Sequence, residues 1–365
     1  MKVSQRIESV DLLRGLTIAA MILVNNPGTW SFGYAPLLHA EWHGLTPTDL
    51  IFPFFLFIVG ISIHLSYKAK LATITVYKKI LIRTLKLFAL GFFLAWFLPY
   101  VPFFNDLETV RILGVLQRIA LVFCISAILY LNINWKTLLG IAVSILIGYF
   151  VLLGFVLLPD GSLPTLNRAP NNWAMYVDLN ILGEHMWKDD YDPEGLLSSI
   201  PAIVSCISGI LIGRMLLSKS NNKMVYFMII SLVLLASGYV WSYWFPLNKA
   251  IWSSSFVLVT TGWATLILGV IYYIQDVKGL QFGSIFKYAG MNAITIYFLS
   301  GFFAKTFYLT KIGESSNIHS WLYDTLFEYD FLSDKMSSLL YALAVTSFYL
   351  VLGYILYKRN IFIKV

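Results

Sequence analysis

The sequence predicts an all-α, polytopic membrane protein, a bundle of about ten transmembrane helices. Three observations support this fold class: 58% of the 365 residues are hydrophobic, only 12% are charged, and the mean hydropathy is +0.74. A soluble domain carries about 25% charged residues. The hydrophobic residues also gather in runs close to the roughly 20 residues that cross a bilayer.

Ten apolar runs are predicted as spanning helices. Lys and Arg cluster before the first run, between the second and third, between the sixth and seventh, and after the tenth. If the helices alternate, all four clusters fall on one side, which predicts that both termini are cytoplasmic. Residues 1–365 are interpreted as one transmembrane domain. The runs lie near residues 10–26, 47–66, 79–99, 110–131, 136–157, 195–216, 224–245, 253–274, 284–307 and 337–357.

The net charge of +7 does not indicate a nucleic-acid partner, because the basic residues sit in these short clusters between apolar runs. Cys124 and Cys206 both fall inside apolar runs, so we predict buried thiols and no disulfide. The sequence holds no metal-ligand spacing of the HExxH or paired CxxC type, and we expect no metal.

The segment from His39 to Pro53 places two histidines and two carboxylates, Asp49 among them, in the turn between the first two runs. A titratable cluster at the mouth of a membrane helix is expensive and usually functional. A histidine there exchanges protons near neutral pH. This loop is therefore the first candidate for chemistry, and the predicted topology puts it on the outer side.

Polar residues at the two ends of the first run have two readings each. Asp11 and Arg14 are three residues apart and can pair on one helical face, or line a cytoplasmic site for an anionic ligand. Asn25 stands just before Pro27 and either ends the helix or orients His39.

The fourth run carries Arg111 and Arg118. Seven residues apart on a helix, they share one face and lie about 10 Å apart along the axis. Arg118 then sits well inside the membrane, where an arginine needs a purpose. Pairing with a membrane carboxylate and binding of a phosphate-bearing ligand both remain open.

Further polar groups gather at the outer ends of later runs. Asp192 and Glu194 close the long outer loop, where they either cap the next helix or present carboxylates to a ligand. The segment from Asn248 to Ser253 offers an amide, an amine, an indole and a hydroxyl in six residues. Asn292 is an amide deep in the ninth run, where it bridges two helices or contacts a ligand.

Taken together, these motifs resemble the heparan-α-glucosaminide N-acetyltransferase family, in particular bacterial members without the lumenal N-terminal domain. The resemblance covers most of the chain. It rests on Ser9-Val-Asp11-xx-Arg14-Gly15, His39-xx-Trp42-x-Gly44-Leu45-Thr46-xx-Asp49-Leu50-xx-Pro53, Val110-Arg111-Ile112-x-Gly114-Val115-Leu116-Gln117-Arg118, Tyr191-Asp192-Pro193-Glu194-Gly195, Leu247-Asn248-Lys249-xx-Trp252-Ser253, Asp276-Val277-Lys278-Gly279-Leu280 and Gly290-Met291-Asn292.

The resemblance implies transfer of an acetyl group from cytoplasmic acetyl-CoA to the amine of a terminal glucosamine on the opposite face. It also implies a homodimer in the bacterial inner membrane, with the active histidine, His39, on the periplasmic side. Asn25 and Asp49 are the expected partners of His39. Acetyl-CoA is expected to contact Arg14, Arg111, Gln117, Arg118, Ser253 and Asn292. The amino-sugar acceptor is expected to contact Trp42, Asp192, Glu194, Asn248, Lys249 and Trp252.

A carrier of N-acetylglucosamine or a related amino sugar is the alternative function. In a carrier, Arg118 and the Asp11–Arg14 pair would gate transport and His39 would couple it to protons. An enzyme depends on the CoA thioester and a carrier does not. Carriers also often contain a two-fold internal repeat, and the sequence shows no clear one.

Overall fold

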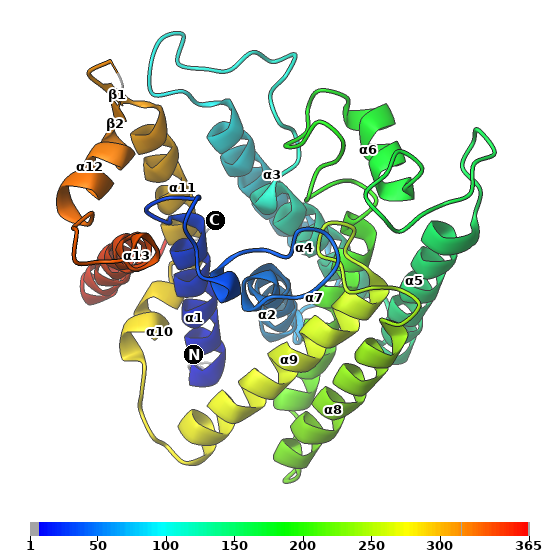
Figure 1. The fold of residues 1–365 in the computed structure, drawn as a ribbon. Coiled ribbons are helices and arrows are strands. Elements are labelled where there is room, and N and C mark those ends of the chain that lie inside the picture. The colour runs from blue at the N-terminus through cyan, green and yellow to red at the C-terminus, as the bar shows by residue number, and fades with distance from the viewer. Residues whose placement is uncertain (1–6, 315, 364–365) are drawn as a thin grey trace.

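The computed structural model describes residues 7–314 and 316–363, which form a bundle of helices (Figure 1). Two short strands, β1 (Lys311–Ile312) and β2 (Ser316–Asn317), pair antiparallel, and three short turns are η1 (Ala35–Leu37), η2 (Pro47–Leu50) and η3 (Tyr273–Val277). The α-helices are α1 (Glu8–Asn25), α2 (Ile51–Tyr67), α3 (Ile74–Trp96), α4 (Val115–Asn132), α5 (Trp135–Phe155), α6 (Trp173–Leu182), α7 (Ser199–Leu216), α8 (Lys223–Trp241), α9 (Ser254–Tyr272), α10 (Ser284–Gly290), α11 (Ala293–Leu309), α12 (Ile318–Leu326) and α13 (Asp334–Lys358).

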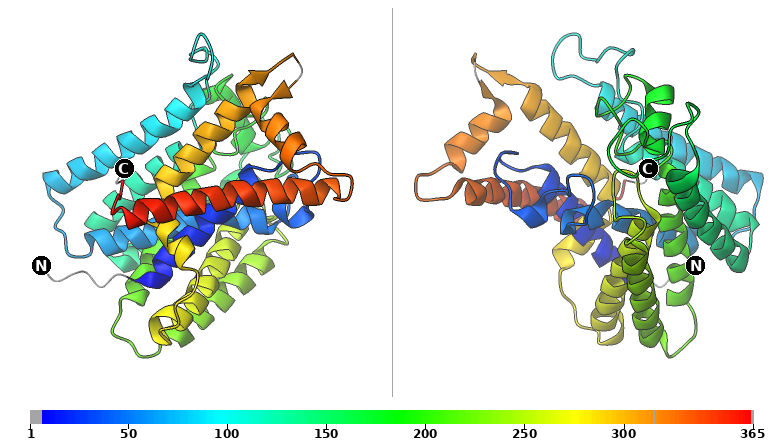
Figure 2. Two further views of the ribbon diagram at one scale, coloured as in Figure 1. Left: turned by 90° about the vertical axis from the view of Figure 1, so that its left-hand side faces the viewer. Right: turned by 45° about the vertical axis from the view of Figure 1, so that its right-hand side comes forward.

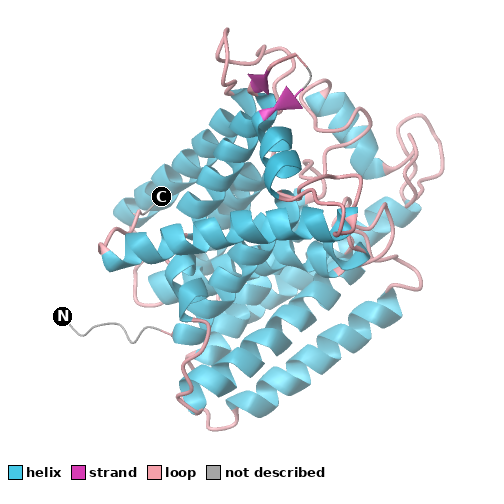
Figure 3. Ribbon diagram, turned by 60° about the vertical axis from the view of Figure 1, so that its left-hand side comes forward, coloured by secondary structure: helices cyan, strands magenta, loops and turns pink. Residues whose placement is uncertain are grey.

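The long helices run from one end of the bundle to the other, and the longer connections gather at one end. In Figure 3 the strand pair and most of the long loops lie toward the top and right of the bundle. The left view of Figure 2 shows the strand pair and the long loops gathered in the same way. The His39 loop, which follows α1, and the segment 156–198 belong to the loop-rich end.

Seven helical segments in the described part of the chain are long and apolar enough to cross a membrane, which confirms a multi-pass membrane protein. They correspond to seven of the ten expected runs. The runs near 10–26, 79–99 and 284–307 are also largely helical, as α1, α3 and α10–α11, but do not meet the combined criteria of length, hydropathy and a low number of charged residues.

The centre of the bundle is formed by α2 and α7. In both helices 67% of the most apolar window is buried inside the protein, against 17% in α8. The outward side chains of α8, such as Met228 and Leu232, are apolar and exposed, as expected for a helix that faces lipid. Cys124 and Cys206 are both free thiols, as predicted; Cys206 is buried as expected, but Cys124 is only half-buried.

Two sequence predictions about helix boundaries are wrong. The fourth helix begins at Val115 and not at residue 110, so Arg111 lies outside the helix and does not share a helical face with Arg118. The sixth predicted helix begins at Ser199 and not at residue 195, with Ser198 at its N-cap, so Asp192 does not cap it.

The ninth run is broken into α10 and α11 at Asn292. The Asn292 amide donates from Nδ2 to the carbonyl oxygen of Ile361 at 3.0 Å and accepts at Oδ1 from the backbone N–H of Ile363 at 2.9 Å. Because its side chain fixes the segment after α13, Asn292 does not act as the simple bridge between two helices that hydropathy suggests.

The central pair α2 and α7 is close because glycines face backbone across the contact. A Cβ atom on Gly60 would overlap the carbonyl oxygen of Cys206, and a Cβ on Gly209 would overlap that of Phe57. Small residues allow such backbone contact between membrane helices, where packing drives association. The side of α2 that faces α7 is therefore fixed in position.

We expect Gly60→Ala to destabilise the protein by about 1–3 kcal/mol, because the added methyl group overpacks the α2–α7 contact. The matched control is Gly148→Ala on α5, where a Cβ would meet nothing within 4 Å. Thermal unfolding of the purified protein in detergent measures both. Equal midpoints for the two variants would contradict the close contact.

Candidate active site

His39 lies against Asp49 and Lys249. His39 Nδ1 is 2.6 Å from Asp49 Oδ1, and Lys249 Nζ lies 3.2 Å from both ring nitrogens of His39. Lys249 Nζ is also 3.9 Å from Asp49 Oδ1. The Asp49 side chain is 1% exposed and that of His39 is 48% exposed, so a buried carboxylate orients an accessible imidazole.

Local sequence fixes the Asp49 carboxylate. Thr46 and Asp49 form a capping box at the start of η2, in which Asp49 Oδ2 accepts the backbone N–H and the hydroxyl of Thr46, both at 3.0 Å. Pro47 occupies the first turn, where its missing N–H costs nothing. The backbone N–H of Ala40 also donates to Asp49 Oδ2 at 3.2 Å, which holds the histidine segment against η2.

Lys249 reaches His39 because its loop is fastened to the His39 loop. The backbone N–H of Gly44 donates to the Leu247 carbonyl at 2.7 Å, and the Asn248 amide lies 3.3 Å from His43 Nδ1. Ser253 caps α9 and accepts the backbone N–H of Asn248 at 3.1 Å. The role of this loop is therefore to hold the amine beside the imidazole.

A cavity of about 270 Å³, here called the His39 cavity, opens beside these groups. Its polar lining comes from five segments that are far apart in the sequence. The lining residues are Met21, Val24, Asn25, His39, Thr48, Ile51, Phe52, Arg111, Val115, Trp187, Pro193, Glu194 and Lys249.

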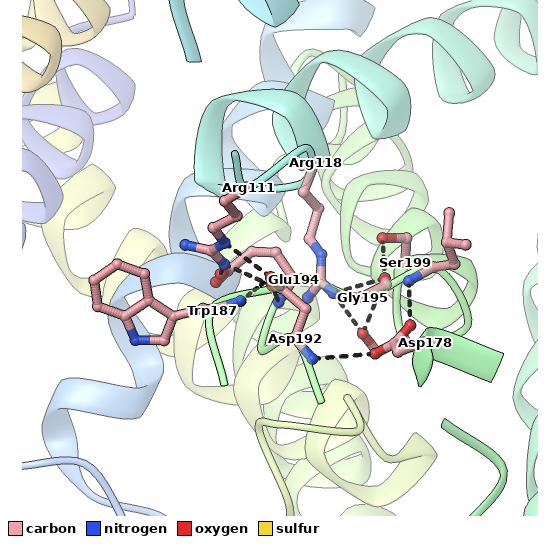
Figure 4. A network of polar contacts seen from close by, with 10 residues as sticks. Arg111, Arg118, Asp178, Trp187, Asp192, Glu194, Gly195 and Ser199 are labelled. Atoms are coloured by element: carbon pink, nitrogen blue, oxygen red, sulfur yellow. Dashed lines mark hydrogen bonds and ion pairs between the residues drawn. The ribbon is translucent and has the colours of Figure 1, made fainter. Parts of the chain in front are cut away.

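Arg111 lines the same cavity as His39. Its guanidinium is held by two carboxylates (Figure 4). Its Nε lies 2.8 Å from Asp192 Oδ2, and its Nη2 lies 2.6 Å from Asp192 Oδ1 and 2.5 Å from Glu194 Oε2. The backbone N–H of Trp187 donates to Asp192 at 2.9 Å, and the guanidinium lies 5.3 Å from the Trp187 ring centre. Arg111 is thus paired with carboxylates, whereas Arg118, for which pairing with a membrane carboxylate was one of the two open readings, forms no ion pair among the described residues.

Arg118 is fully buried. It donates to the Gly195 carbonyl at 3.1 Å and to Ser198 Oγ at 2.5 Å, and its guanidinium lies 5.1 Å from the Trp252 ring centre. Trp252 is buried with a positive φ of 51°, a conformation that costs energy for a residue with a side chain. Arg118 therefore ties the loop before α7 to the loop before α9.

Asp178 on α6 supports the same loop from the other side. Its carboxylate accepts the backbone N–H of Leu196 at 2.9 Å and that of Asp192 at 3.3 Å, as Figure 4 shows. A Cβ on Gly195 would overlap this carboxylate, so the loop needs glycine there. Burial raises the pKa of Asp178 to about 6, against an ordinary value of 3.8.

Burial and neighbouring charges act in opposite directions on the ionisable groups of the cavity. Burial lowers the pKa of the Lys249 amine, although Asp49 and Glu194 oppose the shift. Burial alone would raise the pKa of Glu194, but Arg111, Arg118 and Lys249 outweigh it and hold that pKa below its ordinary value. The cavity therefore combines a carboxyl group whose pKa is lowered by its cationic neighbours with an amine whose pKa is lowered by burial.

A second cavity of about 670 Å³, here called the Arg83 cavity, lies further along the bundle. Arg14 lines it and bonds to Asp11 and to Ser62 Oγ, both at 3.1 Å, which confirms the predicted Asp11–Arg14 pair. Arg83 lies over the Phe123 ring at 4.6 Å. Lys79 and Asn292 also contribute to the lining.

The two cavities follow one another along the same faces of α2 and α4. Phe52 on α2 lines the His39 cavity and Phe55 lines the Arg83 cavity, three residues on. On α4, Val115 lines the His39 cavity and Ile119, four residues further on, lines the Arg83 cavity. Residues three or four apart lie one helical turn apart on one face. The cavities are thus stacked end to end, separated by about one turn of each helix.

The structure brings together part of the predicted site. His39, Asn25, Arg111, Glu194 and Lys249 share the His39 cavity, and Arg14 and Asn292 share the Arg83 cavity. Asn25 ends α1, as predicted, and makes no hydrogen bond to His39 among the described contacts. Asp49 contacts His39 but lines neither cavity. Seven other predicted residues also line neither cavity: Trp42, Gln117, Arg118, Asp192, Asn248, Trp252 and Ser253.

These seven residues support the cavity walls. Trp42, for example, donates from its indole to the Leu166 carbonyl at 2.9 Å, and the Gln117 side chain lies against Gly91 of α3. The sequence analysis assigned no role in the site to Lys79, which belongs to the basic cluster between the second and third runs, or to Arg83, which lies within the third run. Their spacing of four residues at the start of a spanning helix was the available signal.

Among the described residues, no group of three or more His, Cys, Asp and Glu side chains is placed to hold a metal ion. The polar groups of the two cavities are instead cations, carboxylates, amides and one imidazole. The arrangement is suited to general acid–base or nucleophilic chemistry at His39.

Comparison with known proteins relates the chain to one family. A family model described as heparan-alpha-glucosaminide N-acetyltransferase, catalytic, matches residues 6–236. Two proteins named heparan-alpha-glucosaminide N-acetyltransferase are similar over 99% of this chain, at 29% identity for Homo sapiens and 27% for Mus musculus. The chain spans 60% and 61% of the length of these relatives.

The Asp178 carboxyl predicts a pH-dependent contribution to stability. Because its pKa is raised in the folded protein, its contribution is fully present below about pH 3.8 and is lost as the pH rises through about 6. From about pH 4 to about pH 7, the wild type should therefore lose stability relative to Asp178→Asn, by up to about 3 kcal/mol. Thermal midpoints measured across this range check the slope, with the exposed Asp189→Asn as control. Parallel curves for all three proteins would contradict the raised pKa.

Proposed function

Because the chain belongs to the heparan-alpha-glucosaminide N-acetyltransferase family, we propose that it transfers an acetyl group from acetyl-CoA to the amine of an amino sugar. The acceptor we propose is a glycan with a terminal glucosamine-type residue. The names of the relatives support this reaction class. The main support from this chain itself is the pair of stacked cavities.

Acetyl-CoA is proposed to enter the Arg83 cavity. Arg14, Lys79 and Arg83 supply three cations for the phosphates of the nucleotide, and arginine binds phosphate with two parallel donors. From Ser62 in this cavity to Phe52 in the His39 cavity is about 15 Å along α2. The narrow pantetheine arm is long enough to carry the thioester over this distance to His39.

The distribution of charge supports a sidedness for the reaction. The Arg83 cavity lies at the end of α2 that continues into Lys68 and Lys70, in one of the basic clusters expected on the cytoplasmic side. His39 lies at the opposite end of α2. We therefore propose that the donor binds from the cytoplasm of a bacterial inner membrane and that the acceptor binds from the periplasm.

His39 is the proposed reactive group. Asp49 accepts a hydrogen bond from Nδ1–H in the tautomer that leaves a lone pair on Nε2. As a general base, Nε2 takes a proton from the acceptor amine while the amine attacks the thioester carbonyl and CoA leaves as the thiolate. As a nucleophile, Nε2 forms an acetyl-imidazole and releases CoA first, and the amine then attacks this intermediate. Both routes use the same contacts.

The acceptor is proposed to bind between His39 and Glu194. Its amine must come next to His39 Nε2, the place that Lys249 Nζ occupies at 3.2 Å. Lys249 therefore has to move aside, and its lowered pKa makes the neutral amine easier to form there. The Glu194 carboxylate and the Asn25 amide are suited to the hydroxyl groups of a sugar.

We expect His39→Ala to lower the rate of transmembrane acetyl transfer by about 10²–10⁴-fold, the contribution typical of a positioned acid–base group. The assay uses protein in sealed liposomes with labelled acetyl-CoA on the cytoplasmic face and glucosamine on the other. Labelled N-acetylglucosamine is then measured on the acceptor side. The matched control is Glu41→Ala, an exposed side chain in the same loop.

Two results would overturn the proposal. Unchanged transfer by His39→Ala would exclude His39 as the reactive group. Absence of acetyl transfer to glucosamine and to a panel of amino-sugar glycans, together with CoA-independent uptake of N-acetylglucosamine, would instead establish a carrier.

The donor site gives a separate prediction. Arg83→Gln should raise the KM for acetyl-CoA about tenfold or more and leave the KM for the acceptor unchanged, because a lost charge-assisted contact costs about 1.5–3 kcal/mol. Lys86→Gln is the matched control, since Lys86 is one turn further along α3, exposed, and outside the cavity. Steady-state kinetics with each substrate varied in turn separate the two constants. An equal effect of both variants would place the donor elsewhere.

A further inference from the structure

A third cavity of about 230 Å³, here called the basic pocket, lies beyond the end of α2. Its lining comes from the segment after α2, from the junction of α4 and α5, and from α7. Three of its side chains are cations: Lys68, Lys70 and Arg214. The pocket therefore lies where the apolar parts of several helices end, at the end of the bundle opposite to His39.

No carboxylate balances these cations locally. The sequence has no Asp or Glu in residues 50–105, 109–159 or 195–275, and these stretches supply every residue that lines the basic pocket. None of the ion pairs found among the described residues involves Lys68, Lys70 or Arg214. The pocket thus concentrates positive charge without an internal counter-ion.

Aromatic rings place two of the cations at the pocket. The Arg214 guanidinium lies 5.3 Å from the centre of the Trp135 ring, and Lys70 Nζ lies 4.6 Å from the centre of the Tyr67 ring. Such contacts stabilise a cation without neutralising its charge. The hydrogen-bond donors of these cations remain available to an anion.

The start of α5 adds to the positive potential. Asn134 lines the pocket and caps this 21-residue helix by accepting the backbone N–H groups of Lys136 and Thr137. The N-terminal end of a helix carries a partial positive charge. Three cations and this helix end therefore converge on one small cavity.

We propose that the basic pocket is a binding site for a phosphate group, separate from the Arg83 cavity. Arginine and lysine together favour phosphate, because the guanidinium supplies paired donors and the ammonium supplies a compact charge. Basic pockets between helices at the cytoplasmic end of a membrane protein suit the phosphate of an anionic lipid headgroup. A soluble phosphate presents the same group.

The two phosphate sites differ in lining. Tyr67 lines both the Arg83 cavity and the basic pocket. The cations differ: the Arg83 cavity contains Arg14, Lys79 and Arg83. The basic pocket contains Lys68, Lys70 and Arg214. The proposal concerns a second anion and does not depend on the identity of the donor.

The experiment measures phosphate binding by the full-length protein in two arms. One arm follows radiolabelled inorganic phosphate by equilibrium dialysis in detergent. The other follows phosphatidylglycerol by native mass spectrometry, with phosphatidylcholine as the zwitterionic comparison. The test variant is Lys70→Gln with Arg214→Gln. The matched control is Lys219→Gln with Lys223→Gln, which removes two cations from the loop after α7 and the start of α8, outside the pocket.

We expect the wild type and the control to bind in at least one arm, and the test variant to bind at least tenfold more weakly in that arm. Binding only in the first arm identifies a soluble phosphate, and binding only in the second identifies a lipid. A charge-preserving variant, Lys70→Arg with Arg214→Lys, should retain binding, which separates loss of charge from misfolding.

Three results would overturn the proposal: no binding in either arm, equal binding by the test variant and the control, or failure of the charge-preserving variant when it is folded. A test variant that also loses acetyl-CoA binding would make the basic pocket part of the donor site, and would overturn its independence. Loss of acetyl transfer by His39→Ala bears only on the reaction and leaves this proposal intact.

Discussion

The buried charge of Arg118 is the constraint on which the outer half of the protein depends. Its guanidinium is completely inaccessible to water, and an arginine at membrane depth is costly unless polar groups surround it. Its Nη2 donates to the Gly195 carbonyl and to Ser198, in the loop before α7, whereas Nε and Nη1 find no hydrogen-bond partner among the described residues. That loop must therefore fold down onto α4, and in doing so it carries Glu194 into the His39 cavity.

The same arginine also supports another part of the cavity lining. Trp252 packs over the Arg118 guanidinium and meets Phe52 edge to face, with ring centres 5.3 Å apart. Phe52 lines the His39 cavity, so the position of Arg118 is transmitted to the cavity through an aromatic contact. The unfavourable φ of Trp252 is the local cost of placing an indole there, and the buried contacts offset it.

The fold was predictable from the sequence where hydropathy alone decides the structure. The runs that became α1, α2 and α13 were located to within a few residues, because the bilayer requires long apolar helices. The position of Arg111 outside the helix was not predictable. There the Arg111 side chain binds Asp192, a carboxylate 81 residues further along the chain. The break at Asn292 has a similar origin, in contacts with residues 361 and 363.

The candidate site, too, was predictable only where local sequence specifies the contact. The meeting of His39 and Asp49 follows from a ten-residue spacing and a local capping box, both of which are visible in the sequence. The meeting of His39 with Lys249 depends on two loops 210 residues apart, and no local pattern specifies it. Arg83 was missed because a charge at the end of an apolar run is usually read as an interfacial anchor.

The two stacked cavities finally differ in the charge that surrounds them, and this difference suits two unlike substrates. Arg14, Lys79 and Arg83 give the inner cavity a positive lining, which suits the proposed polyanionic donor better than the proposed amino-sugar acceptor. At the outer cavity the carboxylates of Asp49 and Glu194 offset the charges of Lys249 and Arg111, so the proposed acceptor, an ammonium ion in solution, meets carboxylates there as well as cations. An ammonium has no lone pair, so attraction alone gives no reaction. It must lose a proton at the place where it is held, and His39 is the accessible group at that place.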